Sequence, residues 1–150
     1  MKTFAVLLLI CAVALVSVSN AQDSDERATQ LASDVAKRFI GAIDRKRADV
    51  AERLAFVEKR KLPSGATRRF PLVSEGVLNV TIEAREKFGK LLSRSLVQTS
   101  VVKEHHRLPD SQFVEFRYEL RFQKKEKVSE VIKIKVEGDQ AGKVVFFASS

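Results

Sequence analysis

The sequence predicts an α+β fold, with three N-terminal helices packed on a four-stranded antiparallel meander. Two observations lead to this prediction. Up to about Arg94, apolar residues recur at three- and four-residue spacing, which is typical of helices with one buried face. Beyond that residue they alternate with polar residues, which is typical of half-buried strands. Helices followed by strands indicate an α+β domain whose sheet packs one face on the helices and exposes the other.

Length and composition favour a single globular domain. The chain has 150 residues, of which 45% are hydrophobic and 31% are charged. Its 27 Lys and Arg residues outnumber 19 Asp and Glu residues, which gives a formal net charge of +8. These values argue against a collagenous, low-complexity or wholly disordered protein, and they identify no specific biochemical activity.

Residues 1–21 have the pattern of a signal peptide. The apolar run from Phe4 to Val16 is too short to span a bilayer as a helix. Ser19 and Ala21 place small residues at the two positions that signal peptidase reads. We therefore expect residues 1–21 to be removed and residues 22–150 to form the single domain, periplasmic or secreted. An N-terminal membrane anchor is the alternative interpretation.

The helical part divides into three segments and a loop. A stripe of apolar residues predicts a first helix over about 24–44, and a second stripe predicts a helix near 48–61. Two prolines and a glycine between 62 and 71 indicate a loop. A third helix is expected to begin near Ser74 and to carry an apolar face made of Val77, Val80, Thr81, Ala84, Phe88 and Leu91.

Four strands follow, over about 96–103, 113–122, 128–136 and 143–148, with turn residues between them. Alternation in the second and third of these strands separates an apolar face from a charged one. We expect the exposed sheet face to be a ladder of opposite charges rather than a binding groove. Its members are Glu115, Arg117, Glu119 and Arg121 on one strand, with Lys133 and Lys135 on the next.

The stretch from Arg85 to Arg94 reads REKFGKLLSR and resembles the R-x-x-(L/F)-G-x-(L/V)-x-S-R signature of small exported bacterial proteins known as domain of unknown function 4019. The resemblance continues through the turn 108–113 and the segment Ser129 to Ile132. It implies a cystatin-like or nuclear transport factor 2-like cone, in which a curved sheet wraps the helices. It implies no activity, because such folds host both enzymes and binding modules.

Most catalytic and metal-binding patterns are missing from the sequence. His105 and His106 are adjacent, so they point in different directions on a strand or a helix and cannot easily share one metal ion. Cys11 lies in the segment expected to be removed, which leaves the domain without a disulfide. No glycine-rich phosphate loop and no nucleophile elbow are found. We expect no metal and no cofactor.

One carboxyl group is expected on the apolar side of the sheet. Glu130 shares a face with Val128 and Ile132, and Tyr118 shares a face with its own apolar neighbours. One interpretation is a Tyr118–Glu130 acid/base pair. The interpretation that we favour is structural: a buried Glu130 paired with Arg94 or Arg85, most plausibly Arg94, while Tyr118 fills the core.

Three functions remain open from the sequence. The favoured one is a small non-enzymatic exported domain that binds a small apolar ligand or an envelope protein. The second is an isomerase or hydratase built around Tyr118 and Glu130. The third is a cationic module that docks on anionic envelope surfaces through basic clusters, and nucleic acid is not expected as a partner. The clusters are Arg45-Lys46-Arg47, Lys59-Arg60-Lys61, Arg68-Arg69 and Lys124-Lys125-Lys127.

Overall fold

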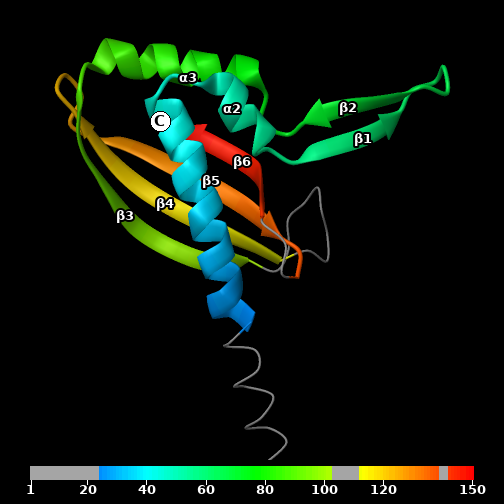
Figure 1. Cartoon of the computed structure of the whole chain (residues 1–150). Helices are drawn as coiled ribbons and strands as arrows, with labels where there is room; N and C mark the ends of the chain where they lie inside the picture. The colour runs from blue at the N-terminus through cyan, green and yellow to red at the C-terminus, as the bar shows by residue number, and fades with distance from the viewer. Residues whose placement is uncertain (1–23, 103–111, 139–141) are drawn as a thin grey trace, which may run out of the picture.

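The computed structural model describes residues 24–102, 112–138 and 142–150 (Figure 1). It confirms the α+β class, with helices followed by antiparallel strands. In chain order the elements are a first helix over 24–44, α2 Ala48–Arg53, β1 Val57–Lys61, β2 Thr67–Pro71, α3 Glu75–Phe88, β3 Leu91–Val102, β4 Gln112–Phe122, β5 Val128–Val136 and β6 Lys143–Ser149.

Strands β3 to β6 form one antiparallel sheet in the order β3-β4-β5-β6. The sheet is therefore the predicted four-stranded meander, and β5 has the bounds expected from the sequence. The first helix crosses one face of the sheet, and α3 lies across the end of the sheet near the start of β3 (Figure 1). The cone-shaped fold implied by the family resemblance stays a prediction.

The first helix packs on the sheet through small residues and one aromatic ring. Ala32, Ala36 and Ala42 are fully buried, so the helix backbone can lie close to the strands. Phe39 is also fully buried, and its ring meets that of Phe147 on β6 edge to face, with centroids 5.3 Å apart. This alanine-rich stripe predicted the helix and now forms one side of the core.

Helix α3 ends earlier than the apolar pattern suggested. Gly89 follows its last residue with φ 81°, a conformation that glycine adopts far more readily than other residues. The chain then turns directly into β3, whose first residue is Leu91. Leu91 therefore belongs to the sheet and not to the apolar face of the helix, as expected from the sequence.

The prediction for residues 48–71 was wrong. Helix α2 ends at Arg53, and the following residues form a two-stranded hairpin, β1–β2, in place of a longer helix and a loop. Long-range pairing explains the early end of the helix. Phe56 N donates to Val144 O at 2.7 Å, and Val144 N donates to Leu54 O at 2.9 Å, so β6 draws this segment into extended backbone.

The hairpin turn is closed by Leu62 N, which donates to Ala66 O at 2.8 Å, and by Gly65 with φ 80°. This glycine conformation suits a tight turn between two antiparallel strands. The proline and glycine signals at 62–66 therefore mark a turn, and the flanking basic residues belong to strands.

Several predictions lie outside the described residues, namely the signal peptide and its cleavage site, the His105-His106 pair and the turn near Pro109. Over the part of the chain that the structure describes, no helix is long and apolar enough to cross a membrane.

Candidate functional site

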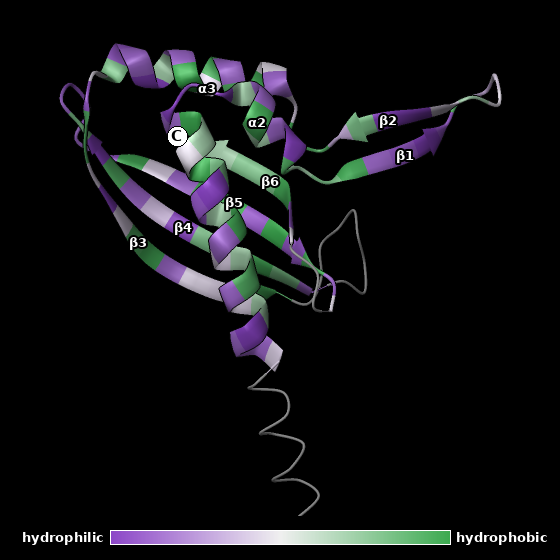
Figure 2. Cartoon of the chain, in the orientation of Figure 1, coloured by the Kyte–Doolittle hydropathy of each residue, from purple (hydrophilic) through white to green (hydrophobic). Residues whose placement is uncertain are grey.

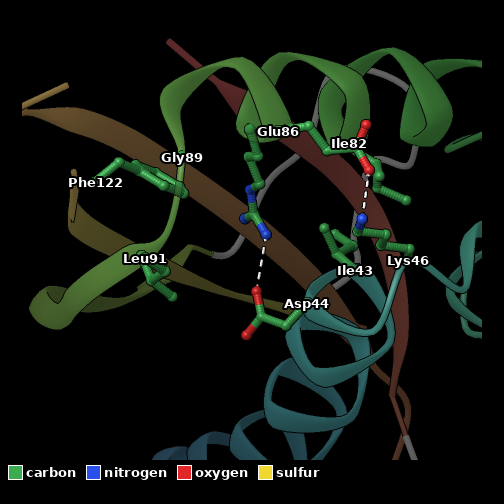
Figure 3. A pocket seen from close by; sticks show the side chains of 9 residues that line it. Ile43, Asp44, Lys46, Ile82, Glu86, Gly89, Leu91 and Phe122 are labelled. Carbon is green, nitrogen blue, oxygen red and sulfur yellow. Dashed lines mark hydrogen bonds and ion pairs between the residues drawn. The ribbon is translucent and has the colours of Figure 1, made fainter. Parts of the chain in front are cut away.

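A pocket of about 490 Å³ lies where the C-terminal ends of the first helix and α3 meet the start of β3 and the end of β4 (Figure 3). Apolar side chains from four different elements make most of its wall. Two acids and two cations are also present. The lining residues are Ile43, Asp44, Lys46, Ile82, Arg85, Glu86, Gly89, Leu91 and Phe122.

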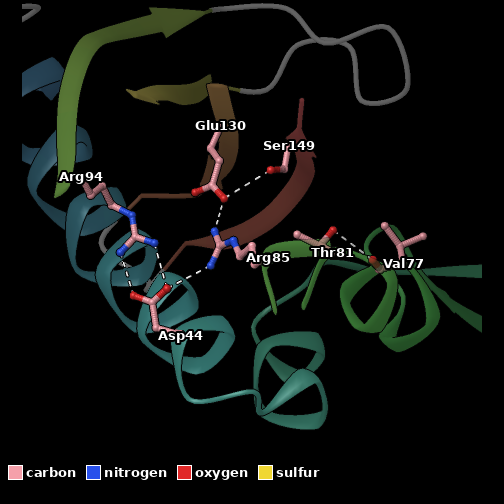
Figure 4. A network of polar contacts seen from close by, with 7 residues as sticks. All are labelled: Asp44, Val77, Thr81, Arg85, Arg94, Glu130 and Ser149. Carbon is pink, nitrogen blue, oxygen red and sulfur yellow. Dashed lines mark hydrogen bonds and ion pairs between the residues drawn. The ribbon is translucent and has the colours of Figure 1, made fainter. Parts of the chain in front are cut away.

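Beside the pocket, four charged side chains form one network (Figure 4). Arg85 on α3 donates to Asp44 Oδ1 at 2.9 Å and to Glu130 Oε1 on β5. Arg94 on β3 donates to both oxygens of Asp44, at 2.7 and 2.8 Å. The network therefore ties the first helix, α3, β3 and β5 together, with two positive and two negative groups in balance.

The positions of Arg85 and Asp44 follow from helix periodicity. Arg85 lies three residues after Ile82 and seven after Leu78, so all three share the buried face of α3. Asp44 lies four residues after the buried Ile40 and so extends the apolar stripe of the first helix. A charged residue in phase with an apolar stripe must find a partner of opposite charge inside the protein.

Titration of Asp44 is controlled by its two arginine partners. Burial by itself raises the pKa of Asp44, but the hydrogen bonds and positive charges of Arg94 and Arg85 outweigh it and hold that pKa below the usual 3.8. Burial alone lowers the pKa of Arg94, whereas the bonded and charged Asp44 raises it above 12.5. Both groups are therefore ionised at neutral pH.

The structure settles which arginine holds Glu130. Glu130 is fully buried, as its place on the apolar side of the strand predicted, and its ion-pair partner is Arg85. The preference for Arg94 was wrong, because Asp44 lies between Arg94 and the sheet and takes both of its hydrogen bonds. Asp44 was the residue missed by sequence reasoning, although its helical phase marks it.

Tyr118 lies directly opposite Glu130 in the β4–β5 register and is half-buried against the core. Burial raises the pKa of Tyr118, the charge of Arg94 lowers it in part, and the charge of Glu130 raises it further. Of the four candidate residues, Arg85 alone lines the pocket. Tyr118, Glu130 and Arg94 stand behind its wall.

The other face of the sheet is charged, as predicted, although the pairs differ in part. Glu115 bonds to Lys133 across the strands at 3.0 Å and to Arg117 on its own strand at 2.7 Å. Lys135, however, pairs with Glu137 and lies over the ring of Phe56, with 5.0 Å between Nζ and the ring centroid.

Among the described residues, no three His, Cys, Asp or Glu side chains gather in a way that could hold a metal ion. Three buried side-chain atoms of the network have no hydrogen-bond partner there: Arg85 Nε, Arg94 Nε and Glu130 Oε2.

Comparison with known proteins finds one family. The model of a family described as "Protein of unknown function (DUF4019)" matches residues 76–146, from α3 through most of β6. The matched range contains Arg85, Arg94, Tyr118 and Glu130, whereas Asp44 and the β1–β2 hairpin precede it. No curated protein and no solved structure matches this chain.

Proposed function

We propose that this chain, a member of the DUF4019 family through residues 76–146, is an exported non-enzymatic domain that binds a small neutral ligand in the pocket beside Arg85. The ligand has an apolar body and a hydrogen-bond acceptor such as a hydroxyl or carbonyl oxygen. The single observation that carries the proposal is a pocket of about 490 Å³ whose apolar wall is interrupted by a buried, anchored arginine. Pockets of this size and lining are typical of small-molecule sites.

The charges around the pocket favour a neutral ligand. Lys46 and Glu86 pair with each other at 2.5 Å at the pocket (Figure 3), and the four-residue network is itself balanced. A ligand with a net charge would meet no group of opposite charge that is not already paired. Burying such a charge is costly, so selection against charged ligands follows from the pairing.

Arg85 supplies the polar contact. Its two terminal nitrogens are held by Asp44 and Glu130, which fixes the guanidinium, and its Nε has no partner among the described residues. A ligand oxygen that accepts from this nitrogen satisfies a donor that is otherwise buried and unpaired. Such pairing rewards a ligand with an acceptor over a plain hydrocarbon of equal size.

The isomerase or hydratase alternative requires Glu130 to meet a substrate. The side chain of Glu130 is 0% exposed and is held by Arg85, and neither Glu130 nor Tyr118 lines the pocket. A proton-transfer group must lie within hydrogen-bond reach of its substrate. The geometry therefore favours binding over catalysis.

A neutral fluorescent ketone, prodan, tests the proposal directly. It combines an aromatic body with a carbonyl acceptor, and its emission shifts on transfer to an apolar site. We expect saturable binding to the protein. Leu91→Trp places a larger side chain in the pocket and should weaken binding by about tenfold or more.

Leu92→Trp is the matched control. Leu92 is the next residue on β3, is 60% exposed and does not line the pocket, so its replacement should leave prodan binding unchanged. Thermal melts of both variants establish that each is folded. Equal binding by folded Leu91→Trp and Leu92→Trp proteins would exclude the pocket as the binding site.

A further inference from the structure

The β1–β2 hairpin is a basic projection that the core does not explain. It extends away from the sheet and the helices (Figure 1), and nearly all of its residues are exposed or half-buried on both faces. Both strands are largely hydrophilic (Figure 2). A two-stranded hairpin without a buried face is at best marginally stable, so burial of apolar residues does not account for it.

Like charges face each other along the hairpin. Its register places Arg60 opposite Arg68 and Lys59 opposite Arg69. Like charges in directly opposite positions destabilise a sheet. The hairpin therefore keeps its charges against its own stability, which points to an anionic surface as the element that offsets the repulsion.

Only one face of the hairpin compensates its charge internally. On that face, Arg60 pairs with Glu58 at 2.7 Å, and the guanidinium carbons of Arg60 and Arg68 lie 5.6 and 5.3 Å from the centroid of the Phe70 ring. Cation–π contacts of this kind partly offset the repulsion between the two arginines.

Strand alternation places the remaining cations on the opposite face. We call this the cationic face, and it consists of Val57, Lys59, Lys61, Thr67, Arg69 and Pro71. Its three cations make no ion pair with any residue that the structure describes. Val57 is 42% exposed beside them, so the face combines unpaired positive charge with an apolar flank.

We infer that the cationic face docks on the anionic headgroups of a lipid bilayer. Three side chains that end in free positive groups attract phospholipid phosphates, and clusters of Lys and Arg beside apolar residues are typical of such surfaces. The turn from Leu62 to Ala66 carries no charge, so it can enter the headgroup region without burying one.

The same face lacks what nucleic-acid recognition uses. It presents no Asn or Gln to read a base edge, and no aromatic ring on which a base can stack. The ring of Phe70 is on the other face and is flanked by two guanidinium groups. The chemistry of the cationic face therefore fits lipid headgroups better than bases.

Docking is independent of the pocket. The hairpin precedes the N-terminal end of α3, whereas the pocket lies at the C-terminal end of that helix, at Glu86 and Gly89. Variants of the hairpin should therefore leave prodan binding unchanged, and the two proposals can fail separately.

Co-sedimentation with lipid vesicles tests the inference. Protein purified after expression of the full chain is mixed with vesicles of phosphatidylglycerol and phosphatidylcholine, or of phosphatidylcholine alone. We expect binding to the anionic vesicles, weakened by salt. The triple change Lys59→Gln, Lys61→Gln and Arg69→Gln should lower the partition coefficient about 100-fold, since each basic side chain near an anionic membrane contributes about fivefold.

The matched control removes the same charge elsewhere, as Lys124→Gln, Lys125→Gln and Lys127→Gln at the turn before β5, and should retain most of the binding. Thermal melts provide a second readout. The hairpin triple variant should be at least as stable as the parent, because a like-charge pair has been removed. Equal loss of binding in both triple variants, or binding to duplex DNA without binding to anionic vesicles, would overturn the inference.

Discussion

Arg85 on α3 donates a hydrogen bond to Glu130 on β5, and the two residues form a buried ion pair between a helix and an inner strand of the sheet. Their side chains are 9% and 0% exposed. The pair matters beyond stability, because Arg85 is also the charged group that the pocket wall presents. Glu130 is therefore a positioning residue, acting on the pocket through Arg85.

Removal of either partner should destabilise the protein strongly. Arg85→Ala leaves a buried carboxylate without its cation, and Glu130→Gln leaves a buried cation with one acid fewer. We expect each to lower the free energy of unfolding by roughly 3–5 kcal/mol. Urea denaturation of both single variants and the double variant measures the coupling, and the double variant should lose less than the sum.

The corresponding cycle between Arg94 and Glu130 serves as the control, because Arg94 gives its hydrogen bonds to Asp44. Its coupling energy should be the smaller of the two. A larger coupling to Arg94 than to Arg85 would contradict the observed pairing.

Acid should weaken the protein through Asp44. Its pKa in the folded protein lies below the ordinary value of 3.8, so the unfolded state binds the proton more readily. The stabilisation is fully present above the ordinary value and is lost as the pH falls through the folded pKa. Urea denaturation at several pH values below about 5 should show a shallower slope for Asp44→Asn than for the parent. Identical slopes would mean that Asp44 is not held ionised by its arginines.

A glycine next to β6 is expected to tolerate no side chain. A Cβ atom at Gly142 would lie 2.5 Å from Ile134 Cγ2 and 2.9 Å from the carbonyl oxygen of Lys135. Gly142→Ala should therefore lower the free energy of unfolding by about 1–3 kcal/mol. Gly76→Ala in the first turn of α3 meets no atom within 4 Å and should be neutral or stabilising by up to about 1 kcal/mol. Thermal melts compare them, and a harmless Gly142→Ala would show that this close approach is wrong.

Export should produce a shortened chain. Cleavage after Ala21 makes Gln22 the first residue of the mature protein, and intact-mass analysis of the exported fraction reads this end directly. Ala21→Leu replaces the small residue at the cleavage position and should leave precursor uncut. Recovery of soluble protein that still begins at Met1 would refute the signal-peptide interpretation.

The sequence anticipates the elements whose local pattern agrees with their packing. The stripe that includes Ala32, Ala36 and Phe39 predicts the first helix, and alternation from Val128 to Val136 predicts β5 to the residue. The same alternation places Glu130 on the buried side. In these segments one periodicity fixes both the backbone and the face that packs.

The errors arise where distant backbone decides. Residues 54–56 leave helix α2 because they bond to Val144, almost ninety positions later in the chain. No local pattern contains that contact, so periodicity continued the helix through β1. The partner of Glu130 was misjudged for a related reason: the choice between Arg85 and Arg94 depends on Asp44, which approaches them from the end of a different helix.

Native mass spectrometry of the protein isolated from the cells that naturally produce it tests the central proposal most directly. A small molecule that occupies the pocket should add a discrete mass to the folded protein, and that mass should be released on denaturation. The Leu91→Trp protein should lack the added mass, and the Leu92→Trp protein should retain it. A folded parent protein that carries no added mass, or an added mass that persists in Leu91→Trp, would contradict ligand binding in the pocket beside Arg85.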